Sequence, residues 1–179
     1  MLLQSGTLEE RGVLDTAAKM CVAARTAPKA KGVDEILTLV LTGDEKNLLA
    51  DKMEELGVRY FKDKAFVWYG RDAENVRKSQ AVVLIGARKS YRGVGQCALC
   101  GFKNCEECKK AGGNCAHLFL DLGIALSSAV LKASGDNVDN RMMWSAGKAA
   151  AEMQYVEGEA FWIGIPLNVS GKNIYFDRQ

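Results

Sequence analysis

Five of the six cysteines of this chain fall between Cys97 and Cys115, and this crowding constrains the fold more than any other feature. Their order is Cys97-x-x-Cys100, four residues, Cys105-x-x-Cys108, and then Cys115. Thiolates are soft ligands that select zinc, cuprous copper or iron–sulfur clusters. The N-terminal sequence MLLQSGTLEERG carries no basic leader, so the disulfide framework of a secreted protein is not expected. The segment is therefore interpreted as metal-binding or redox-active.

The spacing favours an iron–sulfur cluster over zinc. Zinc ribbons usually separate their two CxxC knuckles by a dozen or more residues. Here only four residues separate Cys100 from Cys105, whereas a cluster of iron and sulfide is larger than one ion and tolerates ligands crowded on one loop. Gly101 follows the first CxxC pair and lets the chain curl, so that amide N–H groups approach sulfur. Zinc, thiol redox chemistry and simple burial of the thiols remain alternatives.

The single histidine, His117, limits other chemistry. Zinc proteases of the HExxH type need two histidines, and no GxSxG sequence accompanies this one to suggest a serine hydrolase. His117 follows Cys115 closely and could be a nitrogen ligand. It could equally be a first-turn helix residue that faces solvent.

Charge and composition indicate a globular chain that binds neither nucleic acid nor a membrane surface. Lys and Arg (24) nearly balance Asp and Glu (22), which argues against nucleic acid or a membrane surface as a partner. With 179 residues, 48% of them hydrophobic, the chain can bury one core. Its longest strongly apolar stretch without charge, Leu122 to Leu131, is half of a membrane span. A soluble cytoplasmic protein is expected.

Strands and helices alternate along the chain. Apolar runs predict strands at 36–41, 81–86 and 161–165, an edge strand around 66–69 and an extended tail at 174–176. Helical periodicity predicts helices from 7 to Pro28, and at 44–57, 72–79, 117–133 and 140–153. The fold class is therefore α+β (mixed α/β), a sheet with packed helices. We expect a single domain over 1–179, with 93–117 as an inserted Cys-rich iron–sulfur loop.

Two helix starts have recognisable caps. Thr7-Leu8-Glu9-Glu10 has the form of a capping box, in which the Thr7 hydroxyl and Glu10 satisfy N–H groups of the first turn. Asp44 is suited to cap the second helix, and Gly57 to close it.

The sequence Cys97-x-x-Cys100-Gly-Phe-x-x-Cys105 resembles the four-iron motif of electron-transport and corrinoid iron–sulfur proteins, which a remote fourth cysteine completes. This resemblance implies a [4Fe–4S] cluster with Cys97, Cys100, Cys105 and Cys115 as ligands. Cys108 is the alternative ligand.

A wider set of motifs resembles an uncharacterised prokaryotic family described as containing a ferredoxin domain. The motifs are Asn114-Cys115-Ala, Asp121-Leu-Gly-Ile-Ala, Val138-Asp-Asn-Arg141 and Ser170-Gly-Lys-Asn-Ile-Tyr-Phe-Asp-Arg178. That family has no assigned reaction.

The remaining chain resembles flavin-dependent nitroreductases more weakly. Ala23-Ala-Arg-Thr-Ala-Pro28, the helix with Asp121 and the strand Ile163-Gly-Ile-Pro166 carry the likeness. It implies a nitroreductase-like sheet, a homodimer formed along the helix from Asp121 to Ala133, and FMN as a possible cofactor. The basic residues that could meet the flavin phosphate are Arg25, Lys172 and Arg178.

These features predict an iron–sulfur redox protein that transfers single electrons between a partner and a bound flavin or second acceptor. If it is an enzyme, it is an oxidoreductase. Positive charge around the cysteines would steer an acidic redox partner, and it comes from Arg88, Lys89, Arg92, Lys103, Lys109 and Lys110. The alternative is a zinc-stapled, non-enzymatic scaffold in which the metal supplies folding energy.

Overall fold

A four-stranded antiparallel sheet forms the centre of the molecule, in a computed structural model that describes residues 1–62 and 68–176. The strand order is β1-β2-β4-β3, with β1 at Ile36–Leu41, β2 at Ala81–Arg88, β3 at Asp139–Asn140 and β4 at Ala160–Asn168. Strand β2 is buried along nearly its whole length because it lies between two partners and under helices on both faces. Its unbroken apolar run reflects that position.

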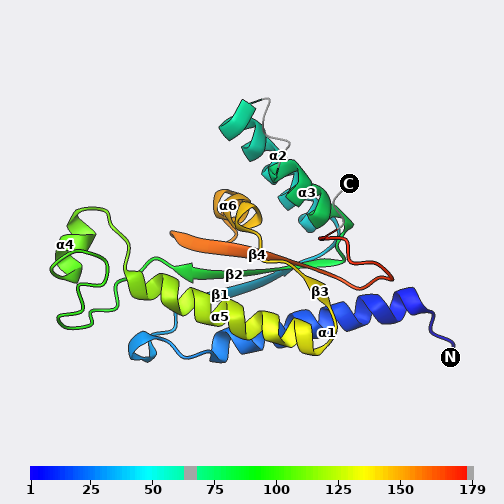
Figure 1. Ribbon diagram of the computed structural model, residues 1–179, viewed down its shortest axis with the longest axis horizontal. Coiled ribbons are helices and arrows are strands. Elements are labelled where there is room, and N and C mark those ends of the chain that lie inside the picture. Colours follow the sequence, from blue (N-terminus) through cyan, green and yellow to red (C-terminus); the bar gives the residue numbers. More distant parts are fainter. Residues whose placement is uncertain (63–67, 177–179) are drawn as a thin grey trace.

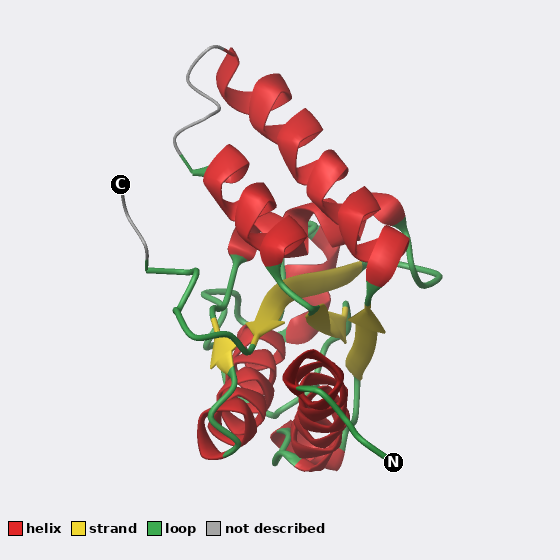
Figure 2. Cartoon of the chain, turned by 90° about the vertical axis from the view of Figure 1, so that its right-hand side faces the viewer, coloured by secondary structure: helices red, strands yellow, loops and turns green. Residues whose placement is uncertain are grey.

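Helices cover both faces of the sheet, which gives three layers (Figures 1 and 2). One face carries α1 (Ser5–Thr26) and α5 (Ala116–Gly135), which pack against each other. The other face carries α2 (Gly43–Phe61), α3 (Tyr69–Lys78) and α6 (Trp144–Met153). A short 3-10 helix, η1 (Ala30–Gly32), leads from α1 to β1.

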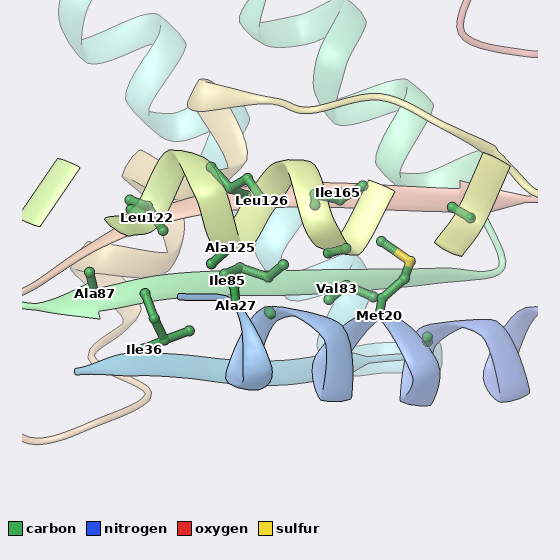
Figure 3. Close-up of a cluster of buried hydrophobic side chains, with 14 of the residues drawn as sticks. Met20, Ala27, Ile36, Val83, Ile85, Ala87, Leu122, Ala125, Leu126 and Ile165 are labelled. Carbon is green, nitrogen blue, oxygen red and sulfur yellow. The ribbon is translucent and has the colours of Figure 1, made fainter. Parts of the chain in front are cut away.

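Each face of the sheet has its own buried core. Along β2, Val83 and Ile85 point to the α1 and α5 side, and Val82 and Leu84 point to the other, as strand alternation requires. Figure 3 shows the first core, where side chains of α1 and α5 meet those of the strands. Both cores are continuous, so the sheet is a rigid base for the segments that leave its ends.

Helix α5 is the one helix in the described ranges that is long and apolar enough, by length and composition, to cross a membrane. In the structure it packs on α1 and β2, with Leu118, Ala125 and Ala129 fully buried. A core helix meets the same criterion.

The structure confirms the α+β class, the three main strands and the long α5 helix. It corrects the helix ends. Helix α1 starts at Ser5 after Gln4, with no side-chain cap, so the capping box at Thr7 is wrong. Helix α2 starts after Thr42, also with no side-chain cap, so the cap expected at Asp44 is wrong, and the helix continues past the buried Gly57. It ends at Phe61, where Lys62 takes a positive φ.

Three other predictions need correction. Of the edge strand expected at 66–69, residues 66–67 lie outside the described residues, and Tyr69 begins α3. The helix expected from Asn140 begins at Trp144, because β3 and a bridge between Met143 and Gly164 extend the sheet first. The segment 174–176 contains a turn and is not extended.

The cysteine segment, residues 93–115, lies between the end of β2 and the start of α5. It contains a short helix that the sequence did not indicate, α4 (Cys105–Lys110). Figure 1 shows this segment projecting beyond the end of the sheet, on the side opposite the N-terminus.

Candidate metal centre

All five clustered cysteines line one pocket of about 340 Å³, which we call the cysteine pocket. Its walls come from the loop 93–105, from α4 and from the start of α5, with Tyr91 and Phe102 as aromatic neighbours. The structure therefore brings together every cysteine that the sequence nominated as a ligand. Cys21 lies apart from them, packed beside the core on α1.

The backbone around the first two cysteines is curled toward sulfur. Gln96 and Ala98, on either side of Cys97, both have positive φ (53° and 44°), which L-residues adopt rarely. The Leu99 N–H donates to Cys97 Sγ at 3.4 Å. Gly101, at φ 83°, donates its N–H to the Ala98 carbonyl at 2.9 Å and closes the turn, as its position after the CxxC pair predicted. Such strain at a loop is typical of a functional site.

Two of the cysteines lie at helix starts. Cys105 is the first residue of α4, which Asn104 caps by accepting a bond from the Glu107 N–H at 2.9 Å. Cys115 is the N-cap residue of the 20-residue α5. The N-terminus of a helix carries partial positive charge, which stabilises a thiolate. Cys115 is thus placed to act as an anionic sulfur ligand.

Cys108 is the most enclosed of the five. Its side chain is fully buried, and its Sγ donates to the Asn114 carbonyl at 3.6 Å. Burial raises the pKa of the Cys108 thiol, and a contact with Cys100 and the charges of Cys115 and Cys105 raise it further. The sulfurs of these four residues thus share one electrostatic environment.

The donor set fits an iron–sulfur cluster. Five soft thiols surround the pocket, an amide N–H points at one sulfur, and a long helix begins at another. Across residues 1–62 and 68–176, no three Cys, His, Asp or Glu side chains converge as one metal ion would require. His117 is not among the residues that line the pocket.

A buried ion pair fixes the root of the cysteine segment. Arg92, just before the loop, contacts Asp121 on α5 at 2.9 Å, and both side chains are nearly inaccessible to solvent. The second carboxylate oxygen of Asp121 accepts the Ala30 N–H at 2.9 Å. The Tyr91 hydroxyl donates to the Gly113 carbonyl at 2.7 Å, across the same loop. Sequence analysis missed the role of Asp121, although a lone carboxylate in an apolar helix is a signal of a buried partner.

Most of the positive charge expected around the cysteines is neutralised by the fold. Arg92 is buried with Asp121, Lys89 contacts Glu159 at 2.7 Å, and Lys110 contacts Glu106 at 2.7 Å. Arg88 lies 3.9 Å from Glu35. Lys103 and Lys109 are exposed. The net positive field at the pocket is therefore weaker than the linear count of charges indicated.

The three basic residues nominated for a flavin phosphate do not form one site within the described chain. Arg25 lies in the last turn of α1 and pairs with Asp34 at 2.8 Å, just before β1. Lys172 follows β4 beyond Asn168. The pairings Ile36↔Ala87 and Ala81↔Leu167 place these positions at opposite ends of β2, about 20 Å apart along a strand. Arg178 lies outside the described residues.

The three-layer fold is that of the flavin-dependent nitroreductases. A BluB-like flavoprotein from Clostridium difficile superposes with a TM-score of 0.60 at 21% identity, over 89% of this chain and 81% of that one. A nitroreductase with bound FMN from Desulfitobacterium hafniense superposes with a TM-score of 0.55 at 16% identity, over 88% and 78%. Fold and site together define a nitroreductase-like protein with a cysteine pocket at one end of its sheet.

The chain belongs to the family described as "Uncharacterized protein containing a ferredoxin domain (DUF2148)", whose model matches residues 111–178. An uncharacterized protein of Archaeoglobus fulgidus is 44% identical over 187 residues, which cover 99% of this chain and 98% of that one. The ferredoxin domain in the family's description points to a redox role.

Proposed function

We propose that the cysteine pocket holds a [4Fe–4S] cluster and that the protein is a one-electron carrier. Cys97, Cys100, Cys105 and Cys115 are the proposed ligands, and Cys108 is the alternative. The observation that supports this proposal is that five thiols from one segment line a single pocket.

The zinc scaffold is the competing function. A single zinc ion needs its four ligands within about 2.3 Å, in a tetrahedron. The presence of five thiols around one pocket, with only four residues between Cys100 and Cys105, favours the larger inorganic core. A zinc site would also supply folding energy, whereas Cys115 is the one residue of the cysteine segment that belongs to either buried core.

When bound, the cluster supplies a centre that takes up and releases one electron. The chain's own groups set how easily this happens. The Leu99 N–H and the start of α5 both stabilise negative charge on sulfur, and so favour the reduced cluster. Cys97, Cys100 and Cys105 are partly exposed, and Leu99 between them is 56% exposed. A protein partner can therefore approach the pocket at this surface.

We further propose an acidic protein as that partner and a second copy of this chain across α5. Lys103 and Lys109 lie on the exposed side of the loop and would attract acidic groups, an effect that salt screens. On α5, Leu120, Ile124 and Leu131 are exposed at 51%, 42% and 68%, which is apolar surface that a second copy would cover. FMN is a second proposed cofactor, supported by the FMN-bound structures of the same fold.

The decisive experiment is metal analysis of protein purified without oxygen. We expect about four irons and four acid-labile sulfides per chain, with broad visible absorption that dithionite bleaches. Colourless protein from the same preparation with one zinc per chain would replace the proposal with the zinc scaffold. Quenching of FMN fluorescence by the loaded protein tests the flavin separately, and no quenching at tens of micromolar would leave a simple electron carrier.

A further inference from the structure

A second pocket, of about 620 Å³, lies against the wall of the cysteine pocket, and we call it the side pocket. It is formed by the end of α6, the turn 154–159, the start of β4, Lys89 and the residues Gly112 and Asn114. Its size is that of a small-molecule site. No residue lines both pockets.

One stretch of backbone separates the two pockets. Asn114 lines the side pocket, and the next residue, Cys115, lines the cysteine pocket. The Asn114 carbonyl accepts the thiol of Cys108 at 3.6 Å, and its side-chain oxygen is buried without a hydrogen-bond partner among the described residues. Consecutive Cα atoms are about 3.8 Å apart. A molecule that contacts Asn114 in the side pocket is therefore separated by one peptide unit from Cys115, a proposed cluster ligand.

The side pocket has fixed aromatic walls. Trp162 is nearly buried and covers Gly86, where a Cβ atom would lie 2.5 Å from the indole ring. Phe161 packs edge-on against Phe119 of α5, with ring centroids 4.8 Å apart, so its ring points to the opposite face of β4 from Trp162. Tyr155 is held by its hydroxyl, 3.2 Å from the sulfur of Met153. The Trp162 and Tyr155 rings share the α6 side of the sheet, and rings held in this way suit a planar, conjugated ligand because stacking requires little further ordering.

The charges around the side pocket select against anions. Its one lysine, Lys89, is paired with Glu159 at 2.7 Å, and Glu157 and Glu159 are both exposed. Among the described residues that line the pocket, a phosphate or carboxylate would meet these two acidic side chains and a lysine that is already paired, while the nearby Arg88 guanidinium donates to the Glu157 carbonyl at 2.7 Å. A neutral molecule avoids this cost.

We propose that the side pocket binds a neutral, planar quinone that exchanges electrons with the cluster in the cysteine pocket; this inference rests on the proposed function. The quinone accepts two electrons, delivered singly in two cycles of the cluster, and two protons from solvent at the open mouth, and becomes the hydroquinone. The reduced protein partner restores the cluster after each electron.

The first test measures binding to the oxidised, cluster-loaded protein, where no electron moves. Duroquinone is the probe, because its ring has no free position for addition of a thiol. Isothermal titration is expected to give one site per chain. Ala151→Phe, at an exposed alanine that lines the side pocket, should weaken binding by about tenfold or more. The control Val58→Phe adds the same ring to an exposed site on α2 and should leave the dissociation constant unchanged.

The second test follows reoxidation of the dithionite-reduced cluster by duroquinone in a stopped-flow instrument. The rate should saturate with quinone concentration in the wild type and in Val58→Phe, and rise linearly in Ala151→Phe. The anionic, planar anthraquinone-2-sulfonate should bind at least about tenfold more weakly, and a Glu157→Gln/Glu159→Gln variant should recover its binding.

The outcomes separate the two proposals. A loaded, reducible protein that shows no duroquinone binding, or binding that Ala151→Phe leaves intact, overturns the side-pocket inference and leaves the electron carrier. A protein that carries no iron overturns the proposed function, whatever the titration gives. Equal affinity for the sulfonate would overturn the assignment of a neutral ligand.

Discussion

The Arg92 guanidinium lies 2.9 Å from the Asp121 carboxylate, with both side chains at most 3% exposed. One group belongs to the root of the cysteine segment and the other to α5, so the pair joins the loop cysteines to the helix that begins at Cys115. A buried pair of this kind is costly to break, because the remaining charge stays buried without a partner.

We predict that Asp121→Asn lowers the free energy of unfolding by about 3–5 kcal/mol, since it leaves Arg92 uncompensated. Urea denaturation of the protein purified without oxygen measures this. The matched control is Glu106→Gln, which breaks an exposed pair with Lys110 and should cost less than about 1 kcal/mol. Equal effects of the two changes would show that the Arg92–Asp121 pair does not anchor the loop.

The ligand assignment predicts which cysteines the iron depends on. Single replacement by serine of Cys97, Cys100, Cys105 or Cys115 should abolish the four-iron absorption, because each removes a thiolate ligand. Cys108→Ser should retain it, and Cys21→Ser, remote on α1, is the control. Iron and sulfide are counted after anaerobic purification. If Cys108→Ser loses its iron and one of the other four variants keeps it, Cys108 is a ligand and the cysteine replaced in that iron-containing variant is not.

The packing between α6 and β4 depends on Gly147. A Cβ atom there would lie 1.8 Å from the backbone oxygen of Trp162, which cannot move without displacing β4. Gly147→Ala should therefore destabilise the protein by about 1–3 kcal/mol or more. Gly12→Ala, at a helical glycine of α1 with open space around it, should instead stabilise it by up to about 1 kcal/mol. Thermal unfolding compares them, and a neutral Gly147→Ala would contradict the packing.

Asp136 gives a pH dependence whose sign can be stated. Its carboxylate accepts bonds from Lys19 and from Thr16, at 2.9 Å and 2.8 Å, and these hold its pKa below the ordinary value. A lowered native pKa stabilises the fold above the unfolded pKa of about 4, and this contribution is lost progressively as the pH falls from that value through the lowered native pKa. The melting temperature of Asp136→Asn should thus lie below the wild type at pH 6, and the difference should shrink as the pH falls below about 4. A constant difference across this range would contradict the prediction.

The proposed dimer predicts an asymmetry between two exposed leucines. Leu131→Lys on α5 should convert a dimer to a monomer in light scattering at micromolar concentration, because it places charge in the covered apolar surface. Leu48→Lys on α2, exposed to a similar degree, should leave the mass unchanged. A monomeric wild type would remove the dimer altogether.

Sequence patterns predict those parts of the fold that depend on residues adjacent in the chain. The run at 81–86 had to be a central strand because all its side chains are apolar, and the CxxC spacing with Gly101 indicated the curled loop. The bridge of Met143 to Gly164 stops α6 from starting earlier, and it depends on a residue that is remote in the sequence. The ion pair of Lys89 and the side pocket also depend on residues that are distant in the sequence. Lys89 and Glu159 meet only after β2 pairs with β4.

The position of the cysteine segment has a consequence for how the protein matures. Of the described residues, none from 93 to 114 belongs to either buried core, so the sheet and its two helical layers can assemble before any iron arrives. On the proposed function, iron and sulfide would be delivered to a scaffold whose sheet and helices have already folded. A cluster lost to oxygen would then be replaced without unfolding the chain.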